Sequence, residues 1–173
     1  QAEVKRRLLE RSDWDGLEVF HRAAGTMEAW GRTLEGQAKS AEVPADEVRL
    51  LRRAANVWRE DIVDLRRAMR CYDRMLELVP DNLGVLAEAI EVYDGADAPK
   101  RLAVGLAALA ERSAEPSQRQ VALRQLADVA SRQLHDSAAG FGALATLIEE
   151  APGALDDYVW LEELARDCGR IGD

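Results

Sequence analysis

Apolar residues recur at steps of three and four along most of the chain, which is the period of an α-helix. The clearest stretch runs through residues 51–80 and predicts two amphipathic helices joined by a short turn. The apolar stripe of the first helix consists of Val48, Leu51, Ala55, Trp58 and Ile62. The stripe of the second helix consists of Leu65, Ala68, Met69, Tyr72, Met75, Leu76 and Val79. The two helices must fold back on each other to bury these stripes, and the pair needs a neighbour because neither helix buries enough surface alone.

The same period predicts helices in the rest of the chain and no strand. We expect ten helices, over residues 2–10, 14–24, 27–40, 46–60, 65–79, 83–94, 98–112, 117–134, 137–150 and 155–168. Gly25 suits the end of one helix, and Asn82 offers a side chain that can cap the start of another.

Four of the five prolines are separated by 36 residues each time, at Pro44, Pro80, Pro116 and Pro152. Proline cannot continue a helix, so these residues are expected in the turns between helical hairpins. Other residues repeat at twice this step, namely Asp64 with Asp136, Leu76 with Ile148, Leu51 with Leu123, Val57 with Val129 and Ala55 with Ala127. A fixed period of this length with two helices in each period is typical of a stacked helical array.

The stretch over residues 51–80 resembles the tetratricopeptide repeat (TPR). The residues that carry the resemblance are Leu51, Ala54, Ala55, Trp58, Ala68, Tyr72, Met75 and Pro80. The resemblance covers most of the chain but is specific only here, and it implies an all-α fold, a right-handed α-α superhelix of about five helical hairpins. The period is 36 rather than the family's 34, and Ala55 and Ile90 replace the usual glycine. The helices are therefore expected to pack further apart or at an altered twist.

This interpretation makes residues 1–173 a single helical-repeat domain. Its units are expected at roughly 1–44 (irregular), 45–80, 81–116, 117–152 and 153–173 (partial). The sequence is interpreted as a piece of a longer array, on which further repeats of the same chain could stack.

Composition and charge narrow the function. Apolar residues make up 47% of the chain and aromatic residues only 5%, which favours helices over sheet. The net charge of −9 argues against nucleic acid as a partner. No apolar run approaches the roughly 20 residues that span a bilayer, so no membrane insertion is expected. Cys71 and Cys168 lie far apart inside predicted helices and are expected as core residues, in a reducing, cytoplasmic compartment.

The residues that usually carry catalysis form no recognisable constellation. His21 and His135 each stand without a second ligand at helical spacing, so no metal or other cofactor is expected and the protein is not predicted to be an enzyme. The adjacent acidic pairs point to different sides of their helices and are expected on solvated faces; they are Glu149 with Glu150, Asp156 with Asp157 and Glu162 with Glu163. The four tryptophans, Trp14, Trp30, Trp58 and Trp160, are expected to pack between helices, with a ligand cage as the alternative.

The strongest functional candidate is a surface. The resemblance implies that the first helix of each hairpin lines a concave side, and there the candidate binding residues are Arg49, Arg52, Asn56 and Arg59. They recur at steps of three and four, so they share one face, and they could bind an acidic peptide or a chain-terminal carboxylate. The next unit places Ala87, Glu88 and Glu91 there, and the third places Arg124 and Asp128. Two alternatives therefore remain. One is a groove of alternating charge that binds a mixed-charge partner, and the other is an arginine-rich face that is only solvated.

We therefore expect a protein–protein interaction scaffold that binds a peptide or protein partner on the concave face of a TPR-like array. The alternatives are a structural spacer in a larger assembly, a non-catalytic helical extension of an enzyme whose catalytic domain lies outside this chain, and a plain helical bundle.

Overall fold

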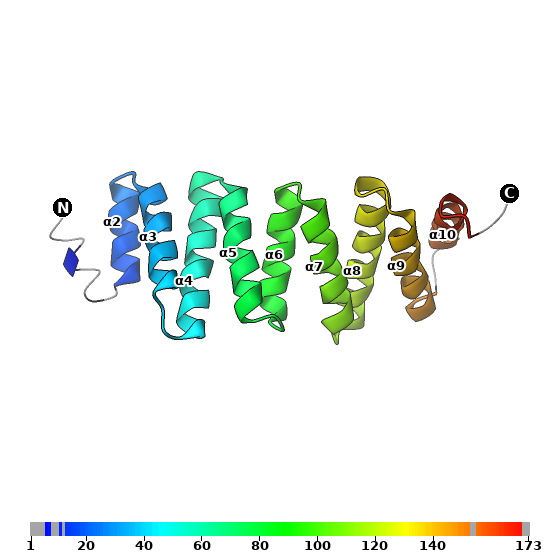
Figure 1. Ribbon diagram of the computed structural model, residues 1–173, viewed down its shortest axis with the longest axis horizontal. Helices are drawn as coiled ribbons and strands as arrows, with labels where there is room; N and C mark the ends of the chain where they lie inside the picture. The colour runs from blue at the N-terminus through cyan, green and yellow to red at the C-terminus, as the bar shows by residue number, and fades with distance from the viewer. Residues whose placement is uncertain (1–5, 8–10, 12, 153–154, 171–173) are drawn as a thin grey trace. The chain divides into compact units, whose positions relative to one another are not determined.

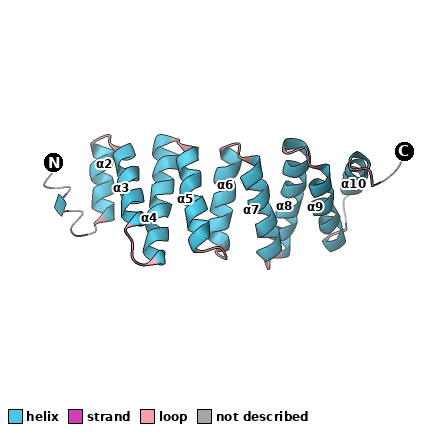
Figure 2. Ribbon diagram, viewed as in Figure 1, coloured by secondary structure: helices cyan, strands magenta, loops and turns pink. Residues whose placement is uncertain are grey.

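The protein is described here from a computed structural model that covers residues 6–7, 11, 13–152 and 155–170. Within these residues the chain is helical and forms no strand, as Figure 2 shows. It divides into two compact units, Gln1–Pro80 and Asp81–Asp173. The all-α fold expected from the apolar pattern is confirmed.

The first unit consists of α2 (Trp14–Ala23), α3 (Met27–Lys39), α4 (Pro44–Asn56) and α5 (Leu65–Leu78). The last turns of the first helix of the second hairpin form a wider π-helix, η1 (Val57–Ile62), which continues α4 without a break. Each helix packs on the helix before it and runs back alongside it (Figure 1). The largest fully buried side chains of this unit are Trp30, Trp58, Tyr72, Leu17, Leu34 and Met75.

The second unit consists of α6 (Leu83–Gly95), α7 (Pro99–Arg112), α8 (Pro116–Asp128), α9 (Ser137–Glu150) and α10 (Leu155–Asp167). A second π-helix, η2 (Val129–Gln133), continues α8. Consecutive helices pack on one another from α6 to α10 (Figure 1). Its core includes Leu106, Leu144, Val85 and Val92, all of which are fully buried.

The four evenly spaced prolines mark the boundaries between hairpins, and two of them, Pro80 and Pro152, lie in turns as predicted. Pro44 and Pro116 occupy the first turn of α4 and α8, where the missing N–H would have no helical partner in any case. Pro80 and Pro152 lie in the turns that precede α6 and α10. Proline therefore separates each second helix from the first helix of the next hairpin.

The true structural repeat is twice the proline period. Helices α4 and α5 begin and end 72 positions before α8 and α9, respectively, and η1 begins 72 positions before η2. The turns repeat in the same way, because Asp64 N–H donates to the Trp58 carbonyl at 2.7 Å and Asp136 N–H donates to the Ala130 carbonyl at 2.8 Å. Left-handed residues also recur, at Val63 (φ 60°) and His135 (φ 55°). Two hairpins with different turns thus form one repeat of 72 residues. The residue pairs that recur at twice the proline step, such as Asp64 with Asp136, reflect this repeat.

One sequence prediction is wrong, and another falls mostly outside the residues that the structure describes. Ile62, predicted on the apolar stripe, is 37% exposed, because the π-helix changes the number of residues per turn and rotates it away from the core. The helix expected over residues 2–10 falls outside the described residues, apart from Arg6 and Arg7, which are helical.

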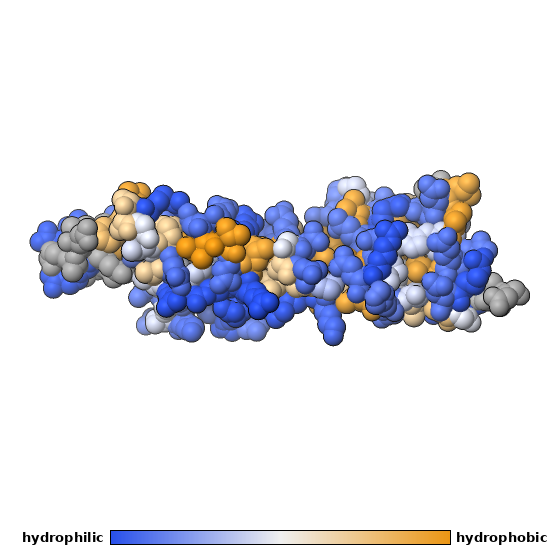
Figure 3. All heavy atoms as spheres, turned by 90° about the horizontal axis from the view of Figure 1, so that it is seen from above, coloured by the Kyte–Doolittle hydropathy of each residue, from blue (hydrophilic) through white to orange (hydrophobic). Residues whose placement is uncertain are grey.

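Figure 3 shows a largely hydrophilic face with smaller hydrophobic patches. Single apolar residues are nevertheless exposed on several helices, including Val19, Val104, Val121 and Leu155. Scattered apolar residues of this kind are normal on soluble proteins and indicate no site by themselves.

Candidate functional site: a groove around helix α8

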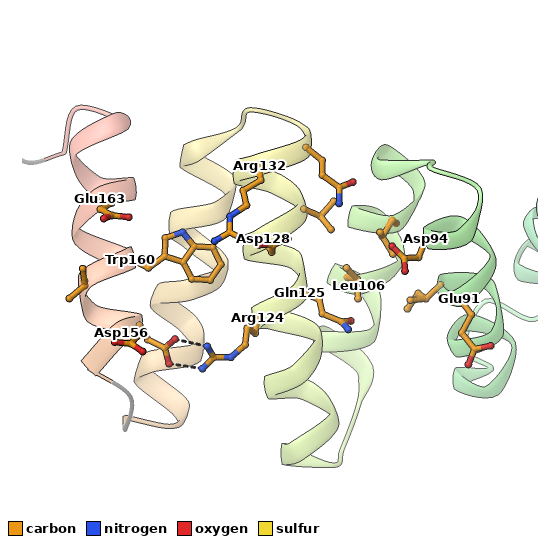
Figure 4. Close-up of a pocket in the computed structure, with 16 residues that line it drawn as sticks. Glu91, Asp94, Leu106, Arg124, Gln125, Asp128, Arg132, Asp156, Trp160 and Glu163 are labelled. Atoms are coloured by element: carbon orange, nitrogen blue, oxygen red, sulfur yellow. Dashed lines mark hydrogen bonds and ion pairs between the residues drawn. The ribbon is translucent and has the colours of Figure 1, made fainter.

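A cavity of about 740 Å³ lies in the second unit, with α8 and η2 at its centre and α6 and α10 on either side. We refer to it as the α8 groove, and Figure 4 shows the side chains that line it. Helices α6, α8 and α10 are the first helices of three successive hairpins. The sequence analysis also placed the candidate binding residues on first helices. The lining residues are Ile90, Glu91, Asp94, Leu102, Leu106, Arg124, Gln125, Asp128, Val129, Arg132, Gln133, Asp156, Asp157, Val159, Trp160 and Glu163.

The floor of the α8 groove is apolar. Leu102 and Leu106 reach it from α7, the second helix of its hairpin, and both are almost fully buried. The indole of Trp160 adds a half-buried aromatic surface from α10. A volume of this size is ordinary for a binding pocket.

The rim of the α8 groove is acidic. Its lining contains six carboxylates and two guanidiniums. The carboxylates belong to Glu91, Asp94, Asp128, Asp156, Asp157 and Glu163, and the guanidiniums to Arg124 and Arg132. The excess of negative charge predicts a preference for cationic groups, which would be strongest at low ionic strength.

Arg124 joins α8 to α10 through a two-point ion pair with Asp157. Arg124 Nη1 donates to Asp157 Oδ1 at 2.6 Å, and Nη2 donates to Oδ2 at 2.6 Å. Asp157 is only 4% exposed, so the sequence prediction of a solvated Asp156–Asp157 pair is wrong for this residue. A buried carboxylate needs a partner, and Arg124 supplies one with the two parallel bonds that suit a guanidinium.

Arg132 lies over the other side of the groove. Its Nη1 is 2.6 Å from Asp128 Oδ1, one helical turn earlier, and its guanidinium carbon is 5.5 Å from the centroid of the Trp160 ring. Figure 4 shows the Arg132 side chain extending toward this ring. The Arg132 side chain is 70% exposed, so the contact is open to solvent. The carboxylate and the aromatic face together form a site suited to a cation.

On the corresponding face of the first unit, the chain's own arginines form ion pairs between the first helices. Arg53 on α4 pairs with Asp15 and Glu18 on α2, and Arg22 on α2 pairs with Asp61 on η1. The residues 72 positions after Arg53, Glu18, Arg22 and Asp61 are Gln125, Ile90, Asp94 and Gln133, and all four line the α8 groove. The groove therefore lies where the second unit lacks the ion pairs that bridge first helices in the first unit.

The four residues selected from the sequence lie on α4 and η1 in the first unit. Arg49 and Asn56 are exposed, whereas Arg52 and Arg59 are half-buried. Arg49 pairs with Asp46 at 2.8 Å and Arg59 pairs with Glu60 at 2.9 Å, so these two guanidiniums already have carboxylate partners. A binding role for this surface stays a prediction.

Sequence reasoning identified part of the α8 groove. Glu91, Arg124 and Asp128 were expected on the concave side and line the groove, whereas Ala87 and Glu88 do not. Among the other lining residues, Asp94, Arg132, Asp157 and Glu163 were not assigned to a binding surface, and Trp160 was expected to pack between helices, with a ligand cage as the alternative. The 72-residue step could have revealed Asp94, because it falls where the first unit has Arg22.

Within the residues that the structure describes, no group of three or more histidine, cysteine, aspartate or glutamate residues is arranged to hold a metal ion. His21 is buried and its ring stacks on Trp30. Its Nδ1 forms a hydrogen bond of 2.8 Å with the Thr26 hydroxyl. Over the same part of the chain, no helix combines the length and the apolar character that crossing a membrane requires.

Comparisons with known proteins support the fold. No family model matches the chain, and no curated protein matches it. Among solved structures, the chain is similar to one described as the MamA RS-1 ArsTM double mutant, with a TM-score of 0.53 and 16% sequence identity. The match covers 91% of this chain and 84% of that chain. MamA is a TPR-containing protein, so the likeness supports a helical-repeat fold of the TPR type.

Proposed function

We propose that the protein is a non-catalytic interaction scaffold that binds a segment of another protein in the α8 groove. The observation that carries this proposal is the groove itself, an apolar floor with a charged rim formed by the first helices of three successive hairpins. Arrays of helical hairpins use such surfaces for extended segments, because each hairpin adds one more strip of side chains. The likeness to a TPR-containing protein supports the same class of function.

A peptide fits the groove better than an enclosed small molecule. The side chains of Arg124 and Arg132 are 52% and 70% exposed, so the groove is open to solvent along α8. The amides of Gln125 and Gln133 lie on the rim and can bond to the backbone N–H and C=O groups of an extended segment. The exposed side chain of Val159 and the half-buried side chain of Ile90 offer a surface to an apolar side chain of the same segment.

A selection from a random peptide library displayed on phage, with the protein immobilised, tests this function. Selected peptides are expected to perturb the NMR signals of groove residues, including the indole N–H of Trp160, which a Trp160→Phe variant identifies. Gln125→Trp places a bulky side chain in the groove and should abolish binding, whereas Gln37→Trp, at an exposed position on α3, should leave it unchanged. Ligands that bind both variants equally, or a selection without ligands, would favour the structural spacer instead.

We propose the α4 surface of Arg49, Arg52, Asn56 and Arg59 as a second, separate contact for an acidic segment. Its support is the shared face of three arginines and an asparagine on α4 and η1. The double variant Arg52→Glu with Asn56→Glu should weaken binding of any partner that uses this surface and leave ligands of the α8 groove unaffected. Unchanged binding of all partners would remove the α4 surface from the proposal.

A further inference from the structure

We infer that the α8 groove recognises a cationic segment, with an arginine or lysine next to an aliphatic residue, and that Arg132 occupies the cation position until that segment arrives. This inference rests on the proposed function and adds the chemistry of the partner. It follows from four features of the groove: its charge excess, the contact of Arg132 with Trp160, the difference between the two units, and the apolar part of its lining.

The excess of carboxylates in the groove favours a partner that carries positive charge. Asp94 on α6 and Asp156 and Glu163 on α10 line the groove, and none of them forms an ion pair within the described residues. They lie on both sides of α8, as Figure 4 shows. A partner that carries positive charges would reduce the repulsion among these carboxylates and would be attracted from a distance.

Arg132 shows what such a cation would contact. Its guanidinium lies over Trp160 and pairs with Asp128, which is the arrangement that a ligand arginine would adopt. The Arg132 pair with Asp128 spans one turn of a single helix and is exposed, so it stabilises the position of the Arg132 side chain only weakly. An incoming side chain held by further contacts can therefore displace Arg132 into solvent.

The first unit supplies an internal comparison. There, Arg53 and Arg22 bridge α2 to α4 and η1 through Glu18 and Asp61. The second unit has Gln125 and Asp94 in place of these two arginines, so its α6 and α8 are not bridged in this way. A guanidinium from a partner, placed between Asp94 and the amides of Gln125 and Gln133, would supply the missing bridge.

The apolar part of the lining sets the second requirement. Val159 is 50% exposed, and Ile90 and Trp160 are half-buried, so a fully charged segment would leave their apolar surface in water. An aliphatic residue beside the cation removes this surface from water and so strengthens binding. A segment that alternates a cation with leucine satisfies both the rim and the apolar part of the lining.

Three acetylated and amidated hexapeptides provide the probe for the ligand. They are GRLRLG, its acidic counterpart GELELG, and a version with neutral citrulline in place of arginine. Fluorescence anisotropy of labelled peptides at low salt should show binding of GRLRLG, about tenfold or more weaker binding of the citrulline peptide, and none of GELELG. Binding of GRLRLG should weaken as salt is added, because exposed charges are screened. Equal binding of GRLRLG and the citrulline peptide would overturn the inference.

Variants of the protein provide the probe for Arg132. Arg132→Met removes the competing cation and keeps an apolar stem, and it should tighten GRLRLG binding about threefold to tenfold. Arg166→Met is the matched control, because Arg166 lies on α10 outside the groove and pairs with Glu162 in the same one-turn spacing. It removes the same charge and should change the affinity less than about twofold. If both variants bind GRLRLG more tightly by the same factor, Arg132 does not occupy the cation position in the free protein.

The failure of this inference can be told from the failure of the proposed function. Asp94→Asn and Glu163→Gln should each weaken GRLRLG binding by about twofold to fivefold while the NMR spectrum of the free protein stays folded. If the phage selection yields acidic or neutral peptides that Gln125→Trp excludes, the groove binds a segment but the cationic preference is wrong. If no peptide of any charge perturbs groove signals, the proposed function fails as well.

Discussion

Arg124 and Asp157 hold α10 against α8 through two parallel bonds of 2.6 Å each, with the carboxylate almost completely buried. The two residues are 33 positions apart in the chain. The pair is therefore a tertiary contact between two hairpins, which fixes one side of the α8 groove.

Removing the guanidinium of this pair should destabilise the second unit. Arg124→Met leaves the Asp157 carboxylate buried without its partner, and we expect the free energy of unfolding to fall by about 1–3 kcal/mol, less than for a fully buried pair because Arg124 is half exposed. Chemical denaturation measures the loss, and hydrogen exchange should become faster in α10. Arg166→Met removes an exposed pair on the same helix and should cost less than about 0.5 kcal/mol. Equal losses for the two variants would contradict a structural role for the Arg124–Asp157 pair.

Gly31 lies where α3 passes closest to Trp58. A Cβ at position 31 would lie 2.7 Å from Cζ2 of the fully buried Trp58 ring, whose indole N–H donates to Glu35 Oε1 at 2.7 Å. Gly31→Ala should therefore lower the free energy of unfolding by about 1–3 kcal/mol, although alanine favours helix.

Gly36 provides the matched control on the same helix. A Cβ at Gly36 would meet no atom within 4 Å, so Gly36→Ala should raise the free energy of unfolding by about 0.5–1 kcal/mol. Thermal denaturation of both variants distinguishes the two effects. Stabilisation by Gly31→Ala would show that the Trp58 ring can move away without cost.

Val63 adopts a left-handed conformation that is unfavourable for a branched side chain. Its φ is 60° and its side chain is 72% exposed, so a replacement loses little packing. Val63→Gly should raise the free energy of unfolding by about 0.5–1 kcal/mol, because the left-handed region costs an L-residue about 1–2 kcal/mol and glycine much less.

Two further variants check the explanation for Val63. Gly25 has φ 65°, so Gly25→Ala should lower the free energy of unfolding by about 1 kcal/mol. Val104→Gly changes an equally exposed valine inside α7 and should also be destabilising, because glycine disfavours helix. A loss of stability in Val63→Gly would show that the turn depends on the valine side chain.

The two cysteines should differ in reactivity. Burial, and then the nearby Glu35 carboxylate, raise the pKa of the Cys71 thiol from 9.0 to about 12. Cys168 is only partly buried. A thiol-specific reagent at pH 8 should therefore modify Cys168 first and Cys71 only when the protein unfolds, because the thiolate is the reactive form.

The same shift predicts a pH dependence of stability. The unfolded Cys71 thiol ionises near pH 9 and the folded one near 12, so its contribution to stability is fully present below pH 9 and is lost as the pH rises toward 12. Cys71→Ala should make the free energy of unfolding fall less steeply over this range. An identical slope in the variant, or rapid modification of Cys71 in the folded protein, would contradict the prediction.

Much of the fold could be predicted from local pattern. The apolar stripes predicted the described helices, with ends that fall close to the observed ones, and Pro44, Pro80, Pro116 and Pro152 marked the hairpins. These features depend on residues within a few turns of one another, and backbone geometry fixes their period. Ile62 departed from the pattern because η1 is a π-helix, whose number of residues per turn differs from the α-helical period used for the prediction.

The binding surface depended on contacts between distant residues. The sequence alone determined that the chain forms paired helices in a proline-punctuated repeat and that its net charge is negative. Only the tertiary structure decided that Asp157 is buried against Arg124, that Arg132 lies over Trp160, and that α6, α8 and α10 enclose a groove. The reason is physical: which flank of a helix stays exposed is set by its neighbours, and a shift of one residue turns a side chain by about 100° to another face.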